Sequence, residues 1–542
     1  MTRFASVRFA ITILFTLVAI HVLFPIHSLL GSDDGKVDTL VVCPKSFHAA
    51  LQEWVDYRQK QGHKIRVIEP TLTPVGLKKA IAEQAKKGDL KNLVLVGDCR
   101  EDRDQKNRGA LVPTDYVKAK VNVRYGAVPD IATDNAFADL DGDGSPELTV
   151  GRIPADSAKQ LTQIIRKVIA YEKKMPNSLW RRKINFIAGV GGFGVVEDKV
   201  IENATKKLIT EMVPSDFETT VTYASWNSPY CPDPRQFSTT TIERLNEGCL
   251  FWVYIGHGHY KYLDYVNFPG KSYKIFDVNQ ADQVKSRAGM PIAIFLACNT
   301  CGFDQPSDCI GEELLKQPNG PVAVLGGSRI TMPYGMSVMS LDLMKDFFSQ
   351  KQLTLGELVR LAKSHLVKDD GHKGEFREML DALGKVFSPT AHLMNDERKE
   401  HAQLIHLLGD PLLRIAKPEA IKVTADEKAT SGEKLSVRFE SPIAGKATIE
   451  LAYRRDRLTF RPKHRRYGVF SDEEMKALQV TYKKANQLVR ASKTIDLNQA
   501  GEASIDLEIP PEVRGDCVIR VYVANDEKFA SGAREIRMKK AK

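Results

Sequence analysis

Short apolar runs, each ended by glycine or a polar residue, recur between residues 37 and 415. The clearest cover residues 250–255, 292–297 and 322–325, and they are followed by Gly-His-Gly-His, Cys-Asn-Thr-Cys and Gly-Gly-Ser-Arg. Runs of this length that are rich in β-branched and aromatic side chains are typical of buried parallel strands. Because ligands bind at the carboxyl ends of such strands, we expect the three following segments to share one edge of a sheet.

Helical periodicity alternates with strand-like runs over most of this region. Expected strands are residues 39–42, 65–68, 93–96, 148–150, 184–188 and 219–222, and expected helices are residues 46–61, 74–87, 155–174, 197–211, 239–246, 340–349, 354–367 and 377–383. Such alternation is typical of a parallel sheet with right-handed crossovers. Residues 100–138 show little periodicity and are expected to be a loop region, and residues 406–415 form a last element.

The pattern changes beyond Lys417 and Pro418. Strands are expected at residues 421–424, 434–439, 447–452, 503–509, 517–523 and 535–538, interrupted by a charged helical insertion at roughly 471–493. Short strands without alternating helices are typical of a β-sandwich. The predicted fold class is therefore α/β, with a parallel sheet flanked by helices, followed by a β-sandwich over residues 419–542.

Length and composition indicate a folded protein of two or three domains. The chain has 542 residues, too many for one hydrophobic core. Its 43% hydrophobic and 27% charged residues are ordinary for a globular protein. The net charge of +10 is modest for this size, and no stacking-aromatic motif accompanies it, so nucleic-acid binding is not favoured.

The first 32 residues have the pattern of an export segment. Arg3 and Arg8 precede an uncharged stretch at residues 9–30, and two aspartates follow it. A basic flank, an apolar run and a polar exit are typical of a signal peptide. The run is also long enough for an uncleaved membrane anchor. Both alternatives predict that the remaining chain lies outside the cytoplasm, secreted or anchored at the cell envelope.

The chemistry expected at the shared edge is that of a thiol and an imidazole. His257 follows the first apolar run and Cys298 the second. A neighbouring imidazole favours the nucleophilic thiolate, and a protonated His257 can donate to a leaving amine. The amides of Gly258 and Cys298 are candidates for an oxyanion hole. These parts describe acyl transfer through a thioester, with Cys301 as the second candidate nucleophile.

Structural alternatives exist for both residues. A buried cysteine at a strand end is commonly a small hydrophobic residue, and a single histidine is commonly structural. The eight cysteines are few for the chain length. The pair Cys298-x-x-Cys301 lacks the second ligand pair of a zinc site, and the expected chemistry requires no cofactor.

Residues 139–147 contain a candidate cation loop. Asp139, Asp141 and Asp143 occupy alternate positions and are followed by glycine, an arrangement that can bind a hard cation such as calcium. The twelfth position of the loop is Val150 rather than glutamate, which excludes an EF-hand. An Asp/Gly-rich turn without a metal is the alternative.

Residues 189–194, Gly-Val-Gly-Gly-Phe-Gly, match the dinucleotide-binding fingerprint. They lie between an expected strand and an expected helix, as that motif requires. The motif alone is weakly specific, so nucleotide binding stays an alternative to chemistry at the thiol.

Four segments resemble the gingipain-type cysteine peptidases. They are residues 246–258 with Gly256-His257-Gly258, residues 297–312 with Ala297-Cys298, residues 141–154, and Leu408-Gly409-Asp410-Pro411. The resemblance covers about residues 37–415. It implies a caspase-like α/β fold, divided here into residues 37–155 and 156–416, with His257 as general acid/base and Cys298 as nucleophile. It also implies a structural calcium ion and an immunoglobulin-like domain after the catalytic one.

Three positions bear on how closely the chain follows that family. The acid that orients the histidine in arginine-cleaving relatives corresponds here to Val190. Asp198 falls where relatives bind a basic P1 side chain, although an acid in a first helical turn also favours the helix dipole. Arg329 lies near the expected pocket wall, where it would favour acidic substrates or pair with Asp198.

The sequence therefore predicts an exported cysteine endopeptidase that acts on protein or peptide substrates, with basic P1 residues as the candidate specificity. The alternative is a catalytically impaired scaffold or secretion-associated surface protein of the same fold. The valine at position 190 is the feature that supports this alternative.

Overall fold

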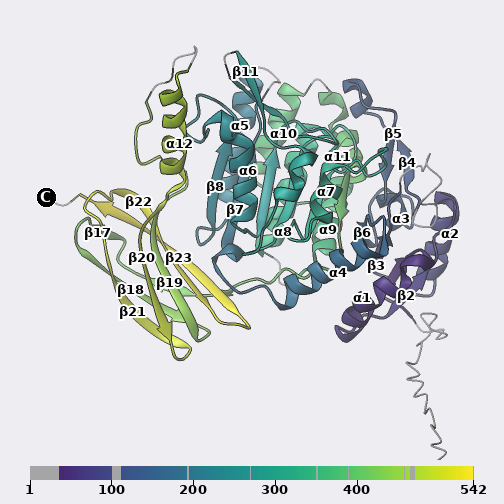
Figure 1. The fold of residues 1–542 in the computed structure, drawn as a ribbon, viewed down its shortest axis with the longest axis horizontal. Coiled ribbons are helices and arrows are strands. Elements are labelled where there is room, and N and C mark those ends of the chain that lie inside the picture. The colour runs from purple at the N-terminus through teal and green to yellow at the C-terminus, as the bar shows by residue number, and fades with distance from the viewer. Residues whose placement is uncertain are drawn as a thin grey trace, which may run out of the picture.

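The computed structural model describes residues 36–99, 112–191, 195–268, 270–349, 352–388, 390–456, 458–463, 465 and 470–540. The expected export segment, residues 1–32, lies outside these ranges. Ten strands form the largest sheet, in the order β2-β1-β3-β6-β14-β13-β12-β9-β7-β8 (Figure 1). Within the described ranges, no helix is long and apolar enough to cross a membrane.

The ten-stranded sheet consists of two parallel blocks joined by one strand. The N-terminal block contains β1 (Thr39–Val42), β2 (Ile65–Ile68), β3 (Asn92–Val96) and β6 (Thr149–Ile153), and the central block contains β7 (Lys183–Ala188), β8 (Glu218–Tyr223), β9 (Phe251–Ile255), β12 (Ile292–Leu296) and β13 (Ala323–Gly327). β14 (Ile405–Leu408) is antiparallel to β13 and parallel to β6. The strands of the N-terminal block lie within residues 37–155, and the division into subdomains there stays a prediction.

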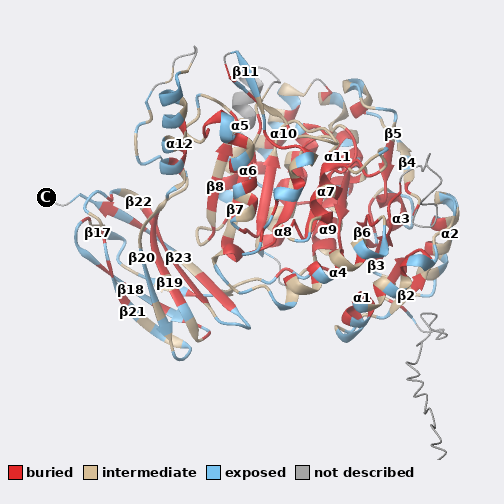
Figure 2. Cartoon of the chain, viewed as in Figure 1, coloured by how far each residue is buried: buried red, intermediate tan, exposed pale blue. Residues whose placement is uncertain are grey.

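Helices cover both faces of the central block. On one face α8 (Pro333–Ser349) and α9 (Leu355–Lys368) share a core with Val253 of β9. On the other face α6 (Phe237–Asn246) and α7 (Ile310–Lys316) share a core with Trp252. Figure 2 shows these strands buried between helices with exposed outer faces. Burial on both sides explains why the strands are continuous apolar runs.

The N-terminal block is also covered on both faces. α1 (His48–Lys60) and α4 (Ala158–Lys173) pack on one face, and α2 (Pro74–Ala85) and α3 (Asn135–Ala138) on the other. The remaining helices of the α/β part are α5 (Val195–Met212), α10 (Glu375–Phe387) and α11 (Met394–Leu404).

The expectation of a loop over residues 100–138 is wrong in part. This region contains β4 (Asp115–Lys118), β5 (Asp130–Thr133) and α3. Its backbone is held by tertiary contacts: the Glu400 carboxylate accepts hydrogen bonds from the amides of Lys120, Val121 and Asn122 at 2.6–2.9 Å. Because these contacts join residues about 280 positions apart in the chain, they produce no periodic pattern in the local sequence.

Residues 419–540 form two further sheets around one core. One sheet contains β15 (Glu419–Ala420), β17 (Lys428–Thr430), β19 (Gly445–Tyr453), β20 (Val489–Leu497), β22 (Gly515–Ala524) and β23 (Phe529–Lys539), and the other contains β16 (Lys422–Thr424), β18 (Lys434–Ser441) and β21 (Gly501–Glu508). Buried residues of both sheets, such as Val437 and Ile519, form one hydrophobic cluster. The two-sheet arrangement agrees with the expected sandwich.

Helix α12 (Asp472–Asn486) is shorter than the insertion expected at 471–493, because residues from Val489 onward pair with β19 as strand β20. The helix lies against β8, the edge strand of the large sheet. The Asn486 side chain donates to the Val221 carbonyl at 2.9 Å and accepts from the Val221 amide at 2.8 Å. It therefore satisfies both backbone groups of an edge residue that would otherwise be open to pairing.

Candidate active site

The loops that carry His257 and Cys298 leave neighbouring strands at the same edge. β9 and β12 are parallel, with Ile255 opposite Leu296, and the Gly256 amide continues the ladder to the Leu296 carbonyl at 3.2 Å. A Cβ atom at Gly258 would lie 2.5 Å from the Cys298 carbonyl oxygen. The two loops are therefore in contact, and only glycine fits at this approach.

Cys298 is the single cysteine of the eight that is not buried, and all eight are free thiols. Cys301, the second candidate nucleophile, is fully buried. Burial, and then the charge of Glu312, raise the pKa of the Cys301 thiol well above its usual range. Because a nucleophilic cysteine must reach substrate and ionise, the geometry favours Cys298 over Cys301.

Three polar groups of Thr331 lie near the Cys298 sulfur. The Thr331 amide lies 3.4 Å and its hydroxyl 3.7 Å from Sγ, and its carbonyl oxygen lies 3.6 Å away. The thiol can donate to the carbonyl, and the amide and hydroxyl can donate to the thiolate. Sequence reasoning missed Thr331, although it follows the Gly-rich end of the third apolar run, now β13.

A carboxylate that the sequence did not predict lies beside the His257 loop. The Tyr254 hydroxyl donates to the His257 carbonyl at 2.7 Å and accepts from the Asp264 amide at 3.3 Å. Burial raises the pKa of the Asp264 carboxyl, while the Tyr265 amide, His257 and the Val190 amide lower it. Asp264 precedes the hairpin of β10 (Tyr265–Phe268) and β11 (Lys271–Lys274), which sequence reasoning missed.

Gly189, the first glycine of the dinucleotide-like motif, packs inside this site. A Cβ atom there would lie 2.8 Å from the Tyr254 hydroxyl and 3.3 Å from Asp264 Oδ2. The Gly189 amide donates to the Ile255 carbonyl at 2.8 Å. Packing against Tyr254 therefore accounts for this glycine without a phosphate, and residues 192–194 of the motif lie outside the described residues.

Arg329 is held in a buried ion pair. Its guanidinium donates to both oxygens of Asp304, at 2.7 and 2.5 Å, and to the Asp130 carbonyl at 3.1 Å. Among the described side chains the partner is Asp304, in the loop after Cys298. Asp198 falls within α5, but its side chain lies outside the described residues, so its role in P1 binding stays a prediction.

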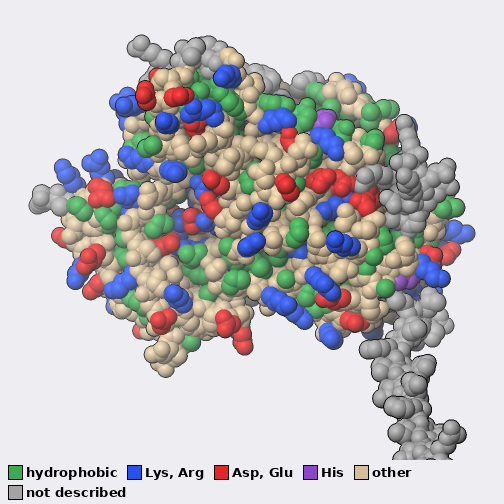
Figure 3. All heavy atoms as spheres, viewed as in Figure 1, with side chains coloured by type: hydrophobic (Ala, Val, Ile, Leu, Met, Phe, Trp, Pro, Cys, Tyr) green, Lys and Arg blue, Asp and Glu red, His purple; other side chains and the backbone are tan. Residues whose placement is uncertain are grey.

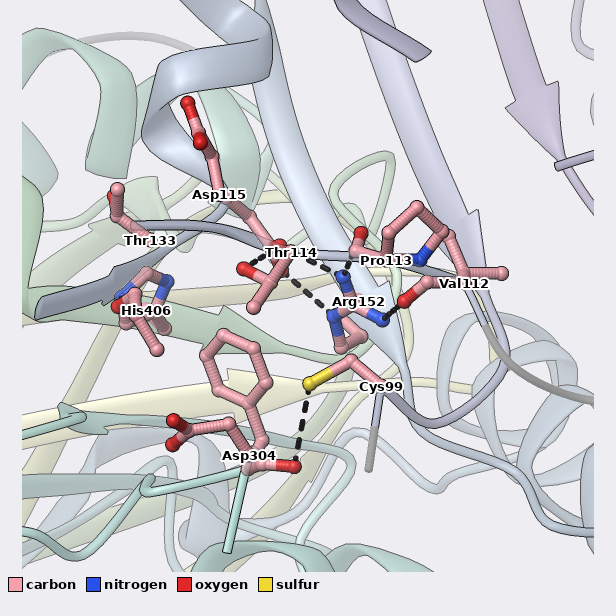
Figure 4. A network of polar contacts seen from close by, with 12 residues as sticks. Cys99, Val112, Pro113, Thr114, Asp115, Thr133, Arg152, Asp304 and His406 are labelled. Carbon is pink, nitrogen blue, oxygen red and sulfur yellow. Dashed lines mark hydrogen bonds and ion pairs between the residues drawn. The ribbon is translucent and has the colours of Figure 1, made fainter. Parts of the chain in front are cut away.

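Arg152 connects the N-terminal block to the same loop. It donates to both oxygens of Asp134 at 2.7 Å and to the carbonyls of Gly97 and Val112, as Figure 4 shows for the Val112 side. Its guanidinium lies 5.1 Å from the ring centre of Phe303. Phe303, five residues beyond Cys298, therefore packs on an arginine whose guanidinium nitrogens are all hydrogen-bonded.

The candidate cation loop is only partly as expected. Carboxylate oxygens of Asp139, Asp141 and Glu147 lie within 4.8 Å of one another, whereas Asp143 accepts a hydrogen bond from the Ser145 amide at 2.7 Å. Three oxygen donors fit a hard cation. Sequence reasoning considered the alternate aspartates and missed Glu147.

The molecular surface has mixed charge on the face shown in Figure 3, where acidic and basic side chains are interspersed. Such a pattern is typical of a solvated surface.

A half-buried thiol beside an imidazole-bearing loop, at the end of a parallel sheet, is the arrangement of an α/β cysteine hydrolase. The sequence model of peptidase family C25 matches residues 32–416. The chain therefore belongs to this family, the gingipain-type cysteine peptidases.

Relatives and solved structures agree with this assignment. Lys-gingipain of Porphyromonas gingivalis (strain ATCC 33277) is 26% identical over 304 residues, which cover 54% of this chain and 16% of the relative. The crystal structure of gingipain R, an Arg-specific cysteine proteinase, has a TM-score of 0.51 at 15% identity and covers 94% of this chain and 99% of its own. A complex of its pro- and mature domains has a TM-score of 0.52, also at 15% identity, and covers 92% of this chain and all of that one. This chain spans only a small part of the curated relatives, and the structural similarity establishes the fold.

Proposed function

We propose that the protein is a cysteine endopeptidase in which Cys298 is the nucleophile and His257 the general acid/base. The observation that carries this proposal is the position of Cys298, the one accessible thiol, at the strand edge where the His257 loop touches it. A thiol and an imidazole in neighbouring loops are the minimum that acyl transfer requires.

The proposed reaction has two steps. The Cys298 sulfur bonds to the peptide carbonyl carbon while its proton passes to His257, which then donates that proton to the amine as the C–N bond breaks. Water, deprotonated by His257, adds to the thioester, and the C–S bond breaks to regenerate the thiol. We propose the amides of Gly258 and Cys298 as donors to the oxyanion, each typically worth ~3–4 kcal/mol of barrier.

Basic P1 residues are the proposed specificity. One similar structure is that of an Arg-specific cysteine proteinase, and one relative is named Lys-gingipain. Asp198 falls where the resemblance expects a P1-binding acid. Cleavage of a peptide library should occur after Arg or Lys and shift away from them in Asp198→Ala. An unchanged profile in that variant would reject Asp198 as the P1 determinant.

Export and domain identity are further parts of the proposal. Residues 1–32 have the composition of a signal peptide or anchor, which supports a secreted or envelope-bound protein. The family resemblance supports a caspase-like topology for the large sheet and an immunoglobulin-like identity for residues 419–542. The oxygen cluster of Asp139, Asp141 and Glu147 supports a structural calcium ion.

Matched cysteine variants test the function directly. Wild-type protein should cleave unfolded protein substrates, and iodoacetamide should label Cys298 first at neutral pH. Cys298→Ala should lower cleavage by at least ~10³-fold, because removing a nucleophile leaves only binding and oxyanion contributions. Cys301→Ala should keep most activity. Equal labelling of both thiols, or cleavage that survives Cys298→Ala, would refute the assignment.

A non-catalytic scaffold is the competing function. Its support in the sequence is Val190, where relatives have an acid. The same assay separates the two, because a scaffold folds normally and cleaves no member of a broad peptide library.

A further inference from the structure

The chain after His257 turns back on itself as a short antiparallel pair. Gly258 and Leu263 form an antiparallel bridge, and the His259 amide donates to the Tyr262 carbonyl at 2.9 Å. The rings of His259 and Tyr262 stack, with centroids 4.5 Å apart. Residues opposite each other in this pair therefore bring their side chains together on one face.

The same register places His257 opposite Asp264. Both lie one residue outside the Gly258–Leu263 bridge, on the side away from the turn. Directly opposite residues of an antiparallel pair have side chains on the same face. The Tyr254 hydroxyl bridges the His257 carbonyl and the Asp264 amide in place of a direct ladder hydrogen bond and so links the two residues.

The two oxygens of the Asp264 carboxylate differ in their hydrogen bonds. Its Oδ1 accepts from the Tyr265 amide at 2.7 Å, whereas Oδ2 is buried and makes no hydrogen bond of ordinary geometry within the described ranges. Buried carboxylate oxygens in folded proteins normally have a donor. The Val190 amide lies close to the carboxylate, and a ring N–H of His257 is the further donor that the opposite position offers. The charge of His257 favours the ionised Asp264.

We propose that Asp264 is the carboxylate that positions His257, supplied by the return of the histidine's own loop instead of by position 190, where this chain has valine. The inference rests on the proposed peptidase function. Asp264 accepts a hydrogen bond from one ring nitrogen, so the other nitrogen is directed toward Cys298. When the thiol proton passes to the ring, the carboxylate stabilises the imidazolium and itself stays ionised.

Val190 supports this assignment through its backbone. The chain at the end of β7 approaches Asp264 so closely that a side chain at Gly189 would contact Oδ2, and the Val190 amide lies against the carboxylate. The Asp264 carboxylate therefore lies against the backbone at positions 189 and 190, where the family resemblance expects the orienting acid.

A proton NMR spectrum tests the hydrogen bond without any need for turnover. In the full-length Cys298→Ala protein, the His257 ring N–H should give a strongly downfield resonance, assigned by its loss in a further His257→Gln variant. Adding Asp264→Asn should remove or shift this resonance. Asp282→Asn, which removes an exposed acid of the 3-10 helix Val278–Gln283, should leave it in place. A resonance that persists in Asp264→Asn, or none assignable to His257 in the folded parent, overturns the proposal.

Kinetics supply the second measurement. Asp264→Asn should lower kcat about 10- to 100-fold with little change in KM, because the lost interaction acts in the transition state. Asp264→Glu should recover part of the loss, and Asp282→Asn should behave as wild type. A fall confined to KM, or equal loss in Asn and Glu variants with an unchanged NMR resonance, would assign Asp264 a merely structural role. If the wild type cleaves nothing, the peptidase proposal fails while the NMR result still decides the His257–Asp264 contact.

Discussion

The central block and the C-terminal unit use strands in opposite ways. In β9 consecutive residues, Trp252 and Val253, are both buried and belong to different cores. In β18 buried and exposed residues alternate along the whole strand. A strand buried on both faces carries polar chemistry only at its ends, and parallel pairing collects the carboxyl ends at one edge. An antiparallel unit instead distributes its polar residues over an exposed face and does not bring them together at one edge.

Two cysteines illustrate the difference. Cys298 follows a parallel strand, is half-buried and is surrounded by the donors of Thr331. Cys517 lies within β22 of the C-terminal unit and is fully buried. Burial raises the pKa of the Cys517 thiol to about 12. The same side chain is thus a candidate nucleophile at a strand end and a hydrophobic residue inside a strand.

The largest expected effect tests the alternation of buried and exposed residues along β18. Leu435→Ala, on the buried face of β18, should lower the free energy of opening of that strand by ~2–5 kcal/mol, whereas Ser436→Ala, on the exposed face, should change it by no more than ~0.5 kcal/mol. In β9, by contrast, Trp252→Ala and Val253→Ala should both destabilise by more than ~1 kcal/mol. Amide hydrogen exchange of peptides from each strand measures these values. Equal effects at Leu435 and Ser436 would contradict the comparison.

Acid should unfold the α/β part before the C-terminal unit. His406 of β14 is buried, its Nε2 lies 3.1 Å from the Ala132 carbonyl, and burial, together with the nearby Lys363 charge, lowers its pKa to about 3. Between pH 6.5 and about 3 the unfolded chain binds a proton that the folded chain does not. Stability therefore falls as pH decreases through this window, by up to ~1.4 kcal/mol per pH unit from this group.

Tryptophan fluorescence can follow that loss, since all four tryptophans precede residue 253. Urea titrations of the wild type from pH 6.5 to 4.5 should show a steeper fall in stability than those of His406→Gln, which keeps a donor for Ala132. Parallel slopes in the two proteins would show that other groups, such as the buried Lys363, dominate.

A smaller effect is expected at the strand edge. Thr331→Val removes the hydroxyl near the Cys298 sulfur and keeps the amide and the side-chain shape. The rate of Cys298 alkylation by iodoacetamide should fall about tenfold, because one hydrogen bond to a charged group contributes ~1.5 kcal/mol. Thr331→Ser, which retains the hydroxyl, should alkylate at nearly the wild-type rate. Identical rates in all three proteins would remove Thr331 from the site.

The smallest effect concerns the proposed calcium ion. Calcium at about ten times its dissociation constant should stabilise the α/β part by ~1.4 kcal/mol, seen as a rise of a few degrees in the fluorescence-detected Tm. Asp141→Asn should abolish the rise, and Asp143→Asn, outside the oxygen cluster, should retain most of it. Equal responses in both variants would contradict the ligand set of Asp139, Asp141 and Glu147.

Most strands and helices followed from local pattern, and the exceptions have physical reasons. The expected strand 39–42 coincides with β1, because a buried apolar run can be recognised from the local sequence alone. The strand β11 and the helix α11 were missed because their residues are largely polar. Such segments gain their stability from tertiary packing, which a single sequence does not display.

The sequence by itself determined that His257 and Cys298 follow apolar strands and that the chain resembles the gingipain-type peptidases. Only the tertiary structure decided that β9 and β12 are neighbours, that Cys298 rather than Cys301 reaches the surface, and that Thr331 lies beside Cys298 and Asp264 beside the His257 loop. The physical reason is that the composition of a strand indicates whether the strand is buried. The order of strands in the sheet and the path of the chain after His257 depend instead on contacts between distant residues. The carboxylate beside the His257 loop lies on this path, so no pattern at position 190 could reveal it.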